Sequence, residues 1–358
     1  MHYSNMKILI LLSVIYYGAS SLYTQSDLVH QFSVKTSDGL IIAGEIDYPQ
    51  VKQNGELILL IAGNGPHTRD MQTSGVAVFK ILADKLLKKG YLVVRFDKRG
   101  FGKSSGSYTD SETDYTTNDL KNDVQKVIDY VKKKEKIKSD KIGIIGHSEG
   151  AIIAAMLAAD YPDLGWSILI APAAISGKEI VIGQKRRNQK RMGITEDLSV
   201  QICQVLDEYF EFVKDGYQSD SLYYAIGRRF LLAHGLDKDD SRINHTFIDQ
   251  LIDAYKSKWY QYFFKLNPSD YLEKIKSPLL AIYGAEDNQV TVEENLIPLY
   301  QALKRSKNKQ FQLTILPDED HFFLRFHGER LEKHKFEQME ISNQLVRTIY
   351  NFIDLKNN

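Results

Sequence analysis

The chain alternates between short apolar runs and longer segments whose apolar residues recur with the spacing of an α-helix. A short apolar run bounded by turn residues is typical of a strand that is covered on both faces. Such runs occupy residues 56–63, 91–97, 141–146, 166–173, 277–287 and 311–320. The pattern therefore predicts a buried strand in each of these places.

Amphipathic segments lie between and after these runs. Their spacing predicts helices over residues 77–90, 119–134, 149–162, 292–306 and 336–353. Strands that alternate with helices favour a mostly parallel sheet with helices on both faces. Two opening runs, 30–36 and 39–49, meet at a Ser-Asp-Gly turn, and they predict an antiparallel hairpin at one edge of that sheet.

The alternation stops between residues 174 and 272. This segment is polar and rich in aromatic residues, and it has helical spacing without a clear strand. We interpret it as a helical cap inserted between two strands. The predicted domain organisation is therefore a first core part at 21–173, the cap at 174–272 and a second core part at 273–358, after a distinct segment at 1–20.

That N-terminal segment has the pattern of a secretory signal peptide. Lys7 precedes the apolar run ILILLSVIYY, and the small residues GASS follow it. The pattern predicts a secreted or periplasmic protein, with cleavage near Ser20 leaving Ser21 or Leu22 first. The run is short for a membrane span, and an uncleaved anchor is the alternative. We expect no stable membrane span after cleavage.

Composition narrows the classes of partner. Lys plus Arg and Asp plus Glu both number 46, so the formal net charge is zero and a nucleic-acid partner is not expected. The basic run at 185–191 is either a binding patch or, as we favour, a solvated helix face. Cys203 is the only cysteine, which excludes an intramolecular disulfide and argues against a cysteine-ligated metal.

The sequence GHSEG at 146–150 places a serine between a predicted strand and a predicted helix. A turn this tight strains the serine backbone and leaves room only for glycine on either side, so the Ser148 hydroxyl projects above the sheet. The backbone N–H of Glu149 opens the helix and is able to bind a developing oxyanion. The His147 side chain is expected to point elsewhere. The alternative is a tight turn with a structural serine.

Three further segments complete a recognisable pattern. RFDKRGFGKSSG at 95–106 resembles the D-x-R-G-x-G-x-S loop of the α/β-hydrolases, while 281–290 and 316–323 resemble the loops that bear their acid and histidine. The resemblance extends from about residue 30 to residue 353 and is weakest in the cap. It implies the α/β-hydrolase fold, with a mostly parallel eight-stranded sheet, helices on both faces and a helical cap insertion.

The resemblance also implies a catalytic triad in the chain order Ser148, Asp287, His321. The chemistry requires these residue types, because a serine hydroxyl needs a nearby base and a carboxylate must hold the imidazole in the correct tautomer. Glu286 is the adjacent alternative for the acid. His327 is the nearest competitor for the base.

The resemblance implies a second oxyanion donor from the loop after the third predicted strand. By that match, the donor is the backbone N–H of Asn64. His67 and Arg69 in the same loop either touch substrate or pack the loop. Asp97 and Arg99 are interpreted as loop scaffolding.

The implied activity is acyl transfer to water through an acyl-serine intermediate, with no metal and no organic cofactor. We favour carboxylic esters, because aromatic residues of the cap are suited to lining a pocket for a small acyl substrate. A serine aminopeptidase acting on short peptides is the alternative, with residues 237–240 or Glu149 binding the ammonium group, and an acyl thioesterase is another. A binding protein on an inactive hydrolase scaffold is the non-enzymatic alternative, and no oligomeric state is predicted.

Overall fold

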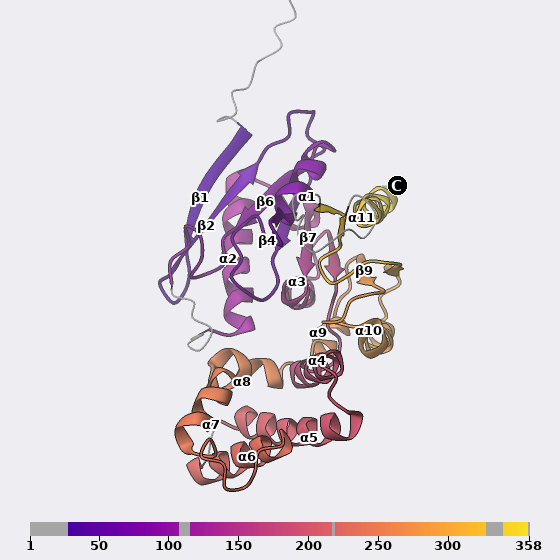
Figure 1. Ribbon diagram of the computed structural model, residues 1–358. Helices are drawn as coiled ribbons and strands as arrows, with labels where there is room; N and C mark the ends of the chain where they lie inside the picture. The colour runs from indigo at the N-terminus through magenta and orange to yellow at the C-terminus, as the bar shows by residue number, and fades with distance from the viewer. Residues whose placement is uncertain (1–27, 107–114, 217–218, 327–338, 357–358) are drawn as a thin grey trace, which may run out of the picture.

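A computed structural model of the chain describes residues 28–106, 115–216, 219–326 and 339–356. The predicted signal peptide, 1–20, and the alternative base His327 lie outside these ranges. Figure 1 shows a layered body of strands and helices, with a group of helices at one end of it.

A single large sheet organises the core. Its strands are β1 (Val29–Lys35), β2 (Ile41–Asp47), β3 (Leu57–Ile61), β6 (Leu92–Phe96), β7 (Ile142–His147), β8 (Trp166–Ile170), β9 (Leu279–Gly284) and β10 (Phe311–Leu316). The eight strands lie in the order β1-β2-β6-β3-β7-β8-β9-β10. β1 and β2 pair antiparallel, β2 pairs antiparallel with β6, and the remaining neighbours run parallel. The predicted mostly parallel sheet is confirmed.

Helices cover both faces of the sheet, as predicted. They are α1 (Val78–Leu87), α2 (Thr117–Glu135), α3 (Glu149–Asp160), α10 (Val292–Ser306) and α11 (Asn343–Lys356). Alternate residues of β3 point to opposite faces: Leu57 and Leu59 join the apolar cluster of α2, α3 and α10, whereas Ile58 and Leu60 join that of α1 and α11. A strand buried on both faces explains the continuous apolar runs of the sequence.

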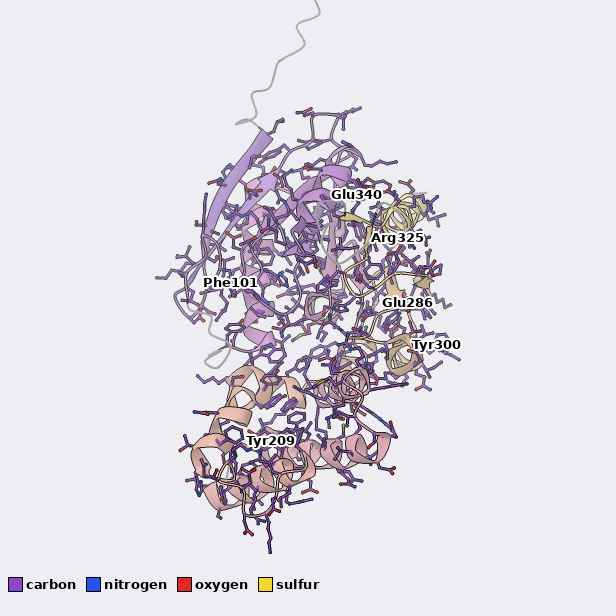
Figure 2. The ribbon with its side chains drawn as sticks, in the orientation of Figure 1. Phe101, Tyr209, Glu286, Tyr300, Arg325 and Glu340 are labelled. Atoms are coloured by element: carbon purple, nitrogen blue, oxygen red, sulfur yellow. The ribbon has the colours of Figure 1, made fainter. Side chains whose placement is uncertain are left out.

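The described residues between β8 and β9 form helices joined by irregular segments, and none of them is in a strand. They form α4 (Gly177–Arg191), α5 (Glu196–Lys214), α6 (Asp220–Ala233), α7 (His245–Ile252), the 3₁₀ turn η3 (Asp253–Lys256), α8 (Lys258–Lys265) and α9 (Ser269–Leu272). We call α4 to α8 the cap, and Figure 1 shows α5 to α8 beyond one end of the sheet. Tyr209, labelled in Figure 2, lies in its aromatic core, where the Phe210 and Phe264 rings are 4.4 Å apart.

The basic run lies on α4. Arg186 pairs with Glu196, and Arg187 pairs with Glu294 at 2.6 Å. These ion pairs occupy two of its cations within the protein and agree with a helix face rather than a binding patch.

Two small hairpins were not predicted. β4 (Gln72–Thr73) pairs with β5 (Val76–Ala77), and β11 (Leu324–Phe326) pairs with β12 (Met339–Ile341). The helix predicted over 336–353 is therefore wrong at its start. The physical reason is a cap: the Ser342 hydroxyl accepts hydrogen bonds from the backbone N–H groups of Gln344 and Leu345, both at 3.2 Å, so α11 begins only after β12.

Across the described ranges, no helix combines the length and the apolar character needed to cross a bilayer. In the same ranges, no group of three or more His, Cys, Asp and Glu side chains is arranged to hold a metal ion.

Candidate active site

The turn between β7 and α3 carries Ser148 in a strained conformation. Its backbone has φ 55° and ψ −120°, a region that residues other than glycine rarely adopt. A Cβ atom on Gly146 would lie 2.1 Å from the carbonyl oxygen of Gly150, and one on Gly150 would lie 2.1 Å from that of Ile61. Close backbone approach therefore requires both glycines, and it holds the serine at the start of α3.

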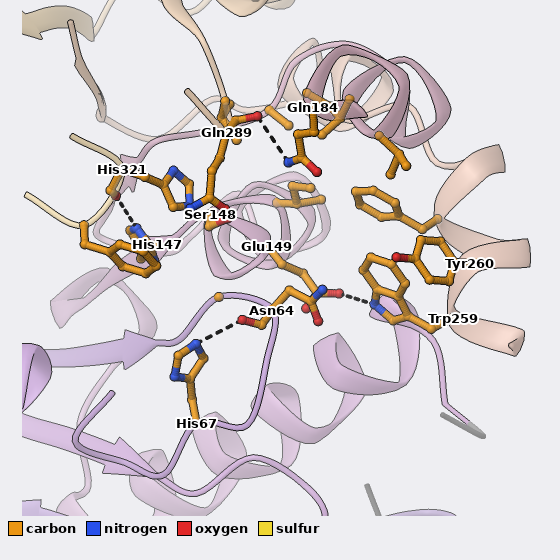
Figure 3. Close-up of a pocket in the computed structure, with 18 residues that line it drawn as sticks. Asn64, His67, His147, Ser148, Glu149, Gln184, Trp259, Tyr260, Gln289 and His321 are labelled. Atoms are coloured by element: carbon orange, nitrogen blue, oxygen red, sulfur yellow. Dashed lines mark hydrogen bonds between the residues drawn. The ribbon is translucent and has the colours of Figure 1, made fainter. Parts of the chain in front are cut away.

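Asp287 and His321 meet at the same edge of the sheet. Asp287 Oδ2 accepts a hydrogen bond from His321 Nδ1 at 2.7 Å, while Oδ1 accepts from the N–H groups of Gln289 at 2.7 Å and Val290 at 2.9 Å. The Asp287 side chain is 0% exposed, so both oxygens are held by the protein. Figure 3 shows the His321 ring directed toward Ser148.

The topology explains why these residues converge. Ser148 follows β7, Asp287 follows β9 and His321 follows β10, and these parallel strands end at one edge of the sheet. Glu286, the alternative acid, is exposed at the surface of the core (Figure 2).

The expectation that His147 points elsewhere is wrong. Its ring lies 4.8 Å from the His321 ring, and its Nε2 atom donates a hydrogen bond to the His321 carbonyl oxygen at 2.8 Å. Burial, reinforced by the neighbouring His321 ring, lowers the pKa of His147 to about 3, so the ring is neutral at pH 7. His147 thus holds the backbone of His321 in place.

A cavity of about 180 Å³ opens over Ser148 and His321. Asn64, His67 and Glu149 line one side of it (Figure 3). Part of its apolar wall comes from α3 and from cap helices, namely Ile152, Ile180, Val181, Trp259 and Phe263. The cap therefore contributes part of the wall of the cavity over Ser148 and His321.

The two backbone groups predicted as oxyanion donors flank this cavity. The Glu149 N–H lies in the first turn of α3, where the helix itself supplies no acceptor. A Cβ atom on Gly63 would lie 3.0 Å from the Ser148 Cβ atom, so the strand-end loop that carries Asn64 passes directly beside Ser148. The Asn64 carbonyl oxygen lies 3.0 Å from His67 Nε2. Burial, followed by the charge of Lys98, lowers the pKa of His67 to about 4.

The other polar residues considered from the sequence bind elsewhere. Arg69 donates to Asp97 through its backbone N–H, Nε and Nη2 atoms, and its Nη1 atom pairs with Glu45 at 2.9 Å. Arg99 donates to both oxygens of Asp123 at 2.7 Å. These contacts agree with a scaffolding role. The acidic run at 237–240 lies in a cap loop and is not among the cavity-lining residues.

The sequence interpretation missed the partners of the Glu149 carboxylate. Oε1 accepts from Trp259 Nε1 at 2.6 Å and from Thr117 Oγ1 at 2.8 Å, and Oε2 lies 3.5 Å from Lys98 Nζ. Lys98 also donates to the Gly63 carbonyl oxygen at 2.8 Å. Lys98 lies between the two matched residues of the D-x-R motif, and this position was the only sequence signal for it.

The cap also holds the loop that carries Asp287. Arg187 Nε donates to the Asn288 carbonyl oxygen at 2.8 Å, and both Arg187 and Gln184 donate to the Gln289 carbonyl oxygen at 3.2 Å. Gln289 in turn donates its N–H to Asp287. Helix α4 therefore braces the acid loop, while α8 reaches Glu149 on the other side.

Comparisons with known proteins identify the family to which the chain belongs. The family model described as X-Pro dipeptidyl-peptidase (S15 family) matches residues 38–322. The esterase EstD of Thermotoga maritima is 20% identical over 308 residues, which are 86% of this chain and 64% of that protein. The chain spans less than two thirds of the length of the curated relatives it matches.

Solved structures show the same fold. An esterase of Pyrococcus furiosus, Pf2001, aligns with a TM-score of 0.55 at 19% identity, over 93% of this chain and 94% of that one. The α/β-hydrolase GrgF from Penicillium sp. aligns with a TM-score of 0.55 at 14% identity, over 92% and 97% of the two chains. Because the family model covers well over half of its residues, the chain belongs to the X-Pro dipeptidyl-peptidase (S15) family of serine hydrolases and has the α/β-hydrolase fold.

Proposed function

We propose that the protein hydrolyses carboxylic esters through an acyl-serine intermediate. Ser148 is the nucleophile, His321 the general base and Asp287 the acid that orients the imidazole. The observation that carries the proposal is the 2.7 Å hydrogen bond from His321 Nδ1 to the buried Asp287 carboxylate, with the ring directed toward Ser148. This bond leaves Nε2 unprotonated and able to accept the serine proton.

The reaction follows from these positions. As Ser148 Oγ attacks the acyl carbon, its proton passes to His321 Nε2, and the carbonyl oxygen becomes an oxyanion facing the N–H groups of Asn64 and Glu149. The C–O bond to the alcohol then breaks, and the imidazolium returns its proton to the leaving oxygen. Water repeats the sequence on the acyl-serine, with the same base, and releases the carboxylic acid.

The charges in the cavity favour a neutral substrate over a free ammonium group. Among the described lining residues, Glu149 carries the carboxylate that faces the site, and it is already bound by Trp259, Thr117 and Lys98. The ammonium of Lys98 offsets its charge. An aminopeptidase requires a carboxylate that remains available for the substrate amine, so this arrangement supports an ester.

The size of the cavity supports a short acyl group. Its volume of about 180 Å³ is below the roughly 300 Å³ at the lower end of ordinary ligand pockets. The apolar wall contributed by α3, α4 and α8 suits a hydrocarbon chain rather than a charged one.

A serine peptidase is the second candidate, and the observation that favours it is the family match, whose description names X-Pro dipeptidyl-peptidase. The same nucleophile, base and oxyanion donors would act on an amide. The two candidates differ in the group that the cavity must bind beside the scissile bond.

One experiment separates these functions. Nitrophenyl esters and a thioester of increasing acyl length are assayed beside aminoacyl and Xaa-Pro amides, with the wild type, Ser148→Ala and the control Ser277→Ala. Ser277 is a buried serine whose hydroxyl has no hydrogen-bond partner among the described residues, so its removal should change little. We expect short esters to be cleaved fastest, with loss only in Ser148→Ala. Faster cleavage of the amides would refute the choice of esters.

A fluorophosphonate probe tests the enzymatic proposal itself. We expect covalent labelling of the wild type and of Ser277→Ala, and none of Ser148→Ala. Folded wild-type protein that stays unlabelled would favour the binding-protein alternative instead.

We further propose export, on the pattern of Lys7, the apolar run after it and the small residues that follow. N-terminal sequencing of the exported protein should find Ser21 or Leu22 first. Exported or membrane-bound protein that still begins at Met1 would contradict cleavage.

A further inference from the structure

Lys98 is a buried cation beside the site that takes no place in the proposed triad. Its side chain is 5% exposed, and its Nζ atom has two partners: the Gly63 carbonyl oxygen at 2.8 Å and Glu149 Oε2 at 3.5 Å. Burial lowers the pKa of Lys98, and the nearby Glu149 charge opposes this shift. Burying an ammonium group is unfavourable unless it is paired, so its place beside these two residues calls for an explanation.

The first partner belongs to the peptide group that carries one predicted oxyanion donor. The carbonyl of Gly63 and the N–H of Asn64 are parts of one planar unit, and the described chain contains no cis peptide bond. Fixing the carbonyl oxygen therefore fixes the direction of the N–H, which lies in the same plane and points the opposite way. A cation on the oxygen also polarises the peptide and strengthens the hydrogen bond that its N–H donates.

The second partner carries the other predicted donor. The Glu149 carboxylate is held by Lys98 from the loop after β6, by Thr117 from α2 and by Trp259 from the cap. The Lys98–Glu149 ion pair thus connects the two peptides on either side of the Ser148 hydroxyl. Lys98 itself is not among the cavity-lining residues, so it acts through these groups and not on the substrate.

We propose that Lys98 is a positioning residue of the oxyanion hole, which orients and polarises the Asn64 N–H through the Gly63 carbonyl and joins it to Glu149. This inference rests on the proposed function, because it takes the N–H groups of Asn64 and Glu149 as the donors. A donor aligned for the oxyanion stabilises the transition state more than the bound ester. Lys98 therefore contributes to kcat and little to KM.

The test must separate this role from simple neutralisation of Glu149. Lys98→Met alone leaves a buried carboxylate unpaired near the developing oxyanion, which would itself slow the reaction. Lys98→Met is therefore compared in a Glu149→Gln background. Removing an oxyanion donor outright lowers kcat by about 10²–10³-fold, so misaligning one should lower kcat of the double variant about tenfold or more below Glu149→Gln alone. KM should change less than about twofold.

The rate of fluorophosphonate labelling at Ser148 gives a second measurement, because the attacked phosphoryl oxygen develops charge in the same hole. We expect it to fall by a similar factor. Equal kcat and labelling rates in the double variant and in Glu149→Gln would overturn the proposal, as would a rise in KM with unchanged kcat. Circular dichroism and a melting curve confirm that each variant is folded. If Lys98→Met does not fold in the Glu149→Gln background, Lys98→Leu, which also has no donor, replaces it, and rates equal to those of Glu149→Gln alone would also overturn the proposal.

Failure of the two proposals can be told apart. Wild-type protein that is labelled at Ser148 and cleaves amides but no ester refutes the ester proposal, while its labelling rates still test Lys98. Ester hydrolysis that depends on Ser148 but not on Lys98 refutes only the positioning role.

Discussion

The Asp287→Asn variant tests the triad with the least disturbance of the fold. Asparagine has the shape of aspartate, and its carbonyl oxygen is able to replace Oδ1 as the acceptor for the N–H groups of Gln289 and Val290. The amide nitrogen then takes the place of Oδ2 and faces His321. Because an amide nitrogen donates, His321 Nδ1 must accept, and its proton moves to Nε2. That tautomer has no lone pair for the Ser148 proton.

The expected loss is large because the wrong tautomer removes the base altogether. An equivalent change in a serine protease triad lowers kcat by about 10⁴-fold, which corresponds to ~5.4 kcal/mol in the activation barrier. The assay is kcat for a short nitrophenyl ester, with Glu286→Gln as the neighbouring, exposed control that should stay within about twofold of the wild type. A folded Asp287→Asn protein that keeps more than a tenth of the wild-type kcat would refute the assigned role, as would an equal loss in Glu286→Gln.

Three further changes test the surroundings of the site. Trp259→Phe removes the N–H group that donates to Glu149 at 2.6 Å. In urea denaturation, its free energy of unfolding should fall by about 1.5–3 kcal/mol more than that of the control Trp166→Phe. The Trp166 Nε1 atom has no hydrogen-bond partner among the described residues, so equal losses in the two variants would contradict the prediction. Gly63→Ala would place a Cβ atom 3.0 Å from the Ser148 Cβ atom, and kcat should fall about 10²-fold because Ser148 is displaced. An unchanged kcat would contradict this and show that the loop moves to accept the methyl group. Because the pKa of His147 is lowered from 6.5 to about 3, the unfolded chain binds more protons between these values, so stability from this residue is complete above pH 6.5 and falls as the pH drops below it. The urea concentration at the midpoint of unfolding should fall less between pH 7 and pH 5 in His147→Asn than in the wild type. An equal fall in the two proteins would show that other groups cause the pH dependence.

The sequence predicted those helices and strands whose own residues determine their structure. Strands such as β3 and β7 are buried on both faces, so their apolar runs need no knowledge of their neighbours. The start of α11 was missed because β12 exists only by pairing with β11, a contact that the local spacing of 336–341 does not encode. The predicted helix was a reasonable interpretation of the pattern, and tertiary pairing overrode it.

The residues of the candidate site also differ in how far the sequence predicts them. Ser148 follows β7 directly, while Asp287 and His321 lie in the loops that follow β9 and β10. Because parallel strands bring their ends together, position in the sequence is enough to place all three at one edge. Lys98 and Trp259 reach Glu149 across 51 and 110 residues, and their direction depends on how the side chains pack. Lys98 stands within the D-x-R motif, but neither that motif nor any pattern around Trp259 indicates these contacts.

Glu149 is constrained both by its position in the sequence and by tertiary packing. Its place after Ser148 gives only its backbone N–H a role in the proposed reaction, and any residue type at this position except proline would supply that group. Its carboxylate, however, is where the loop after β6, helix α2 and the cap meet. A neutral side chain there would leave the Lys98 ammonium buried without a counter-charge, and one that is also too short to reach Trp259 would remove the hydrogen bond that joins the cap to Glu149 at the start of α3. The identity of residue 149 is therefore constrained by the elements around it, although the proposed reaction uses only its N–H.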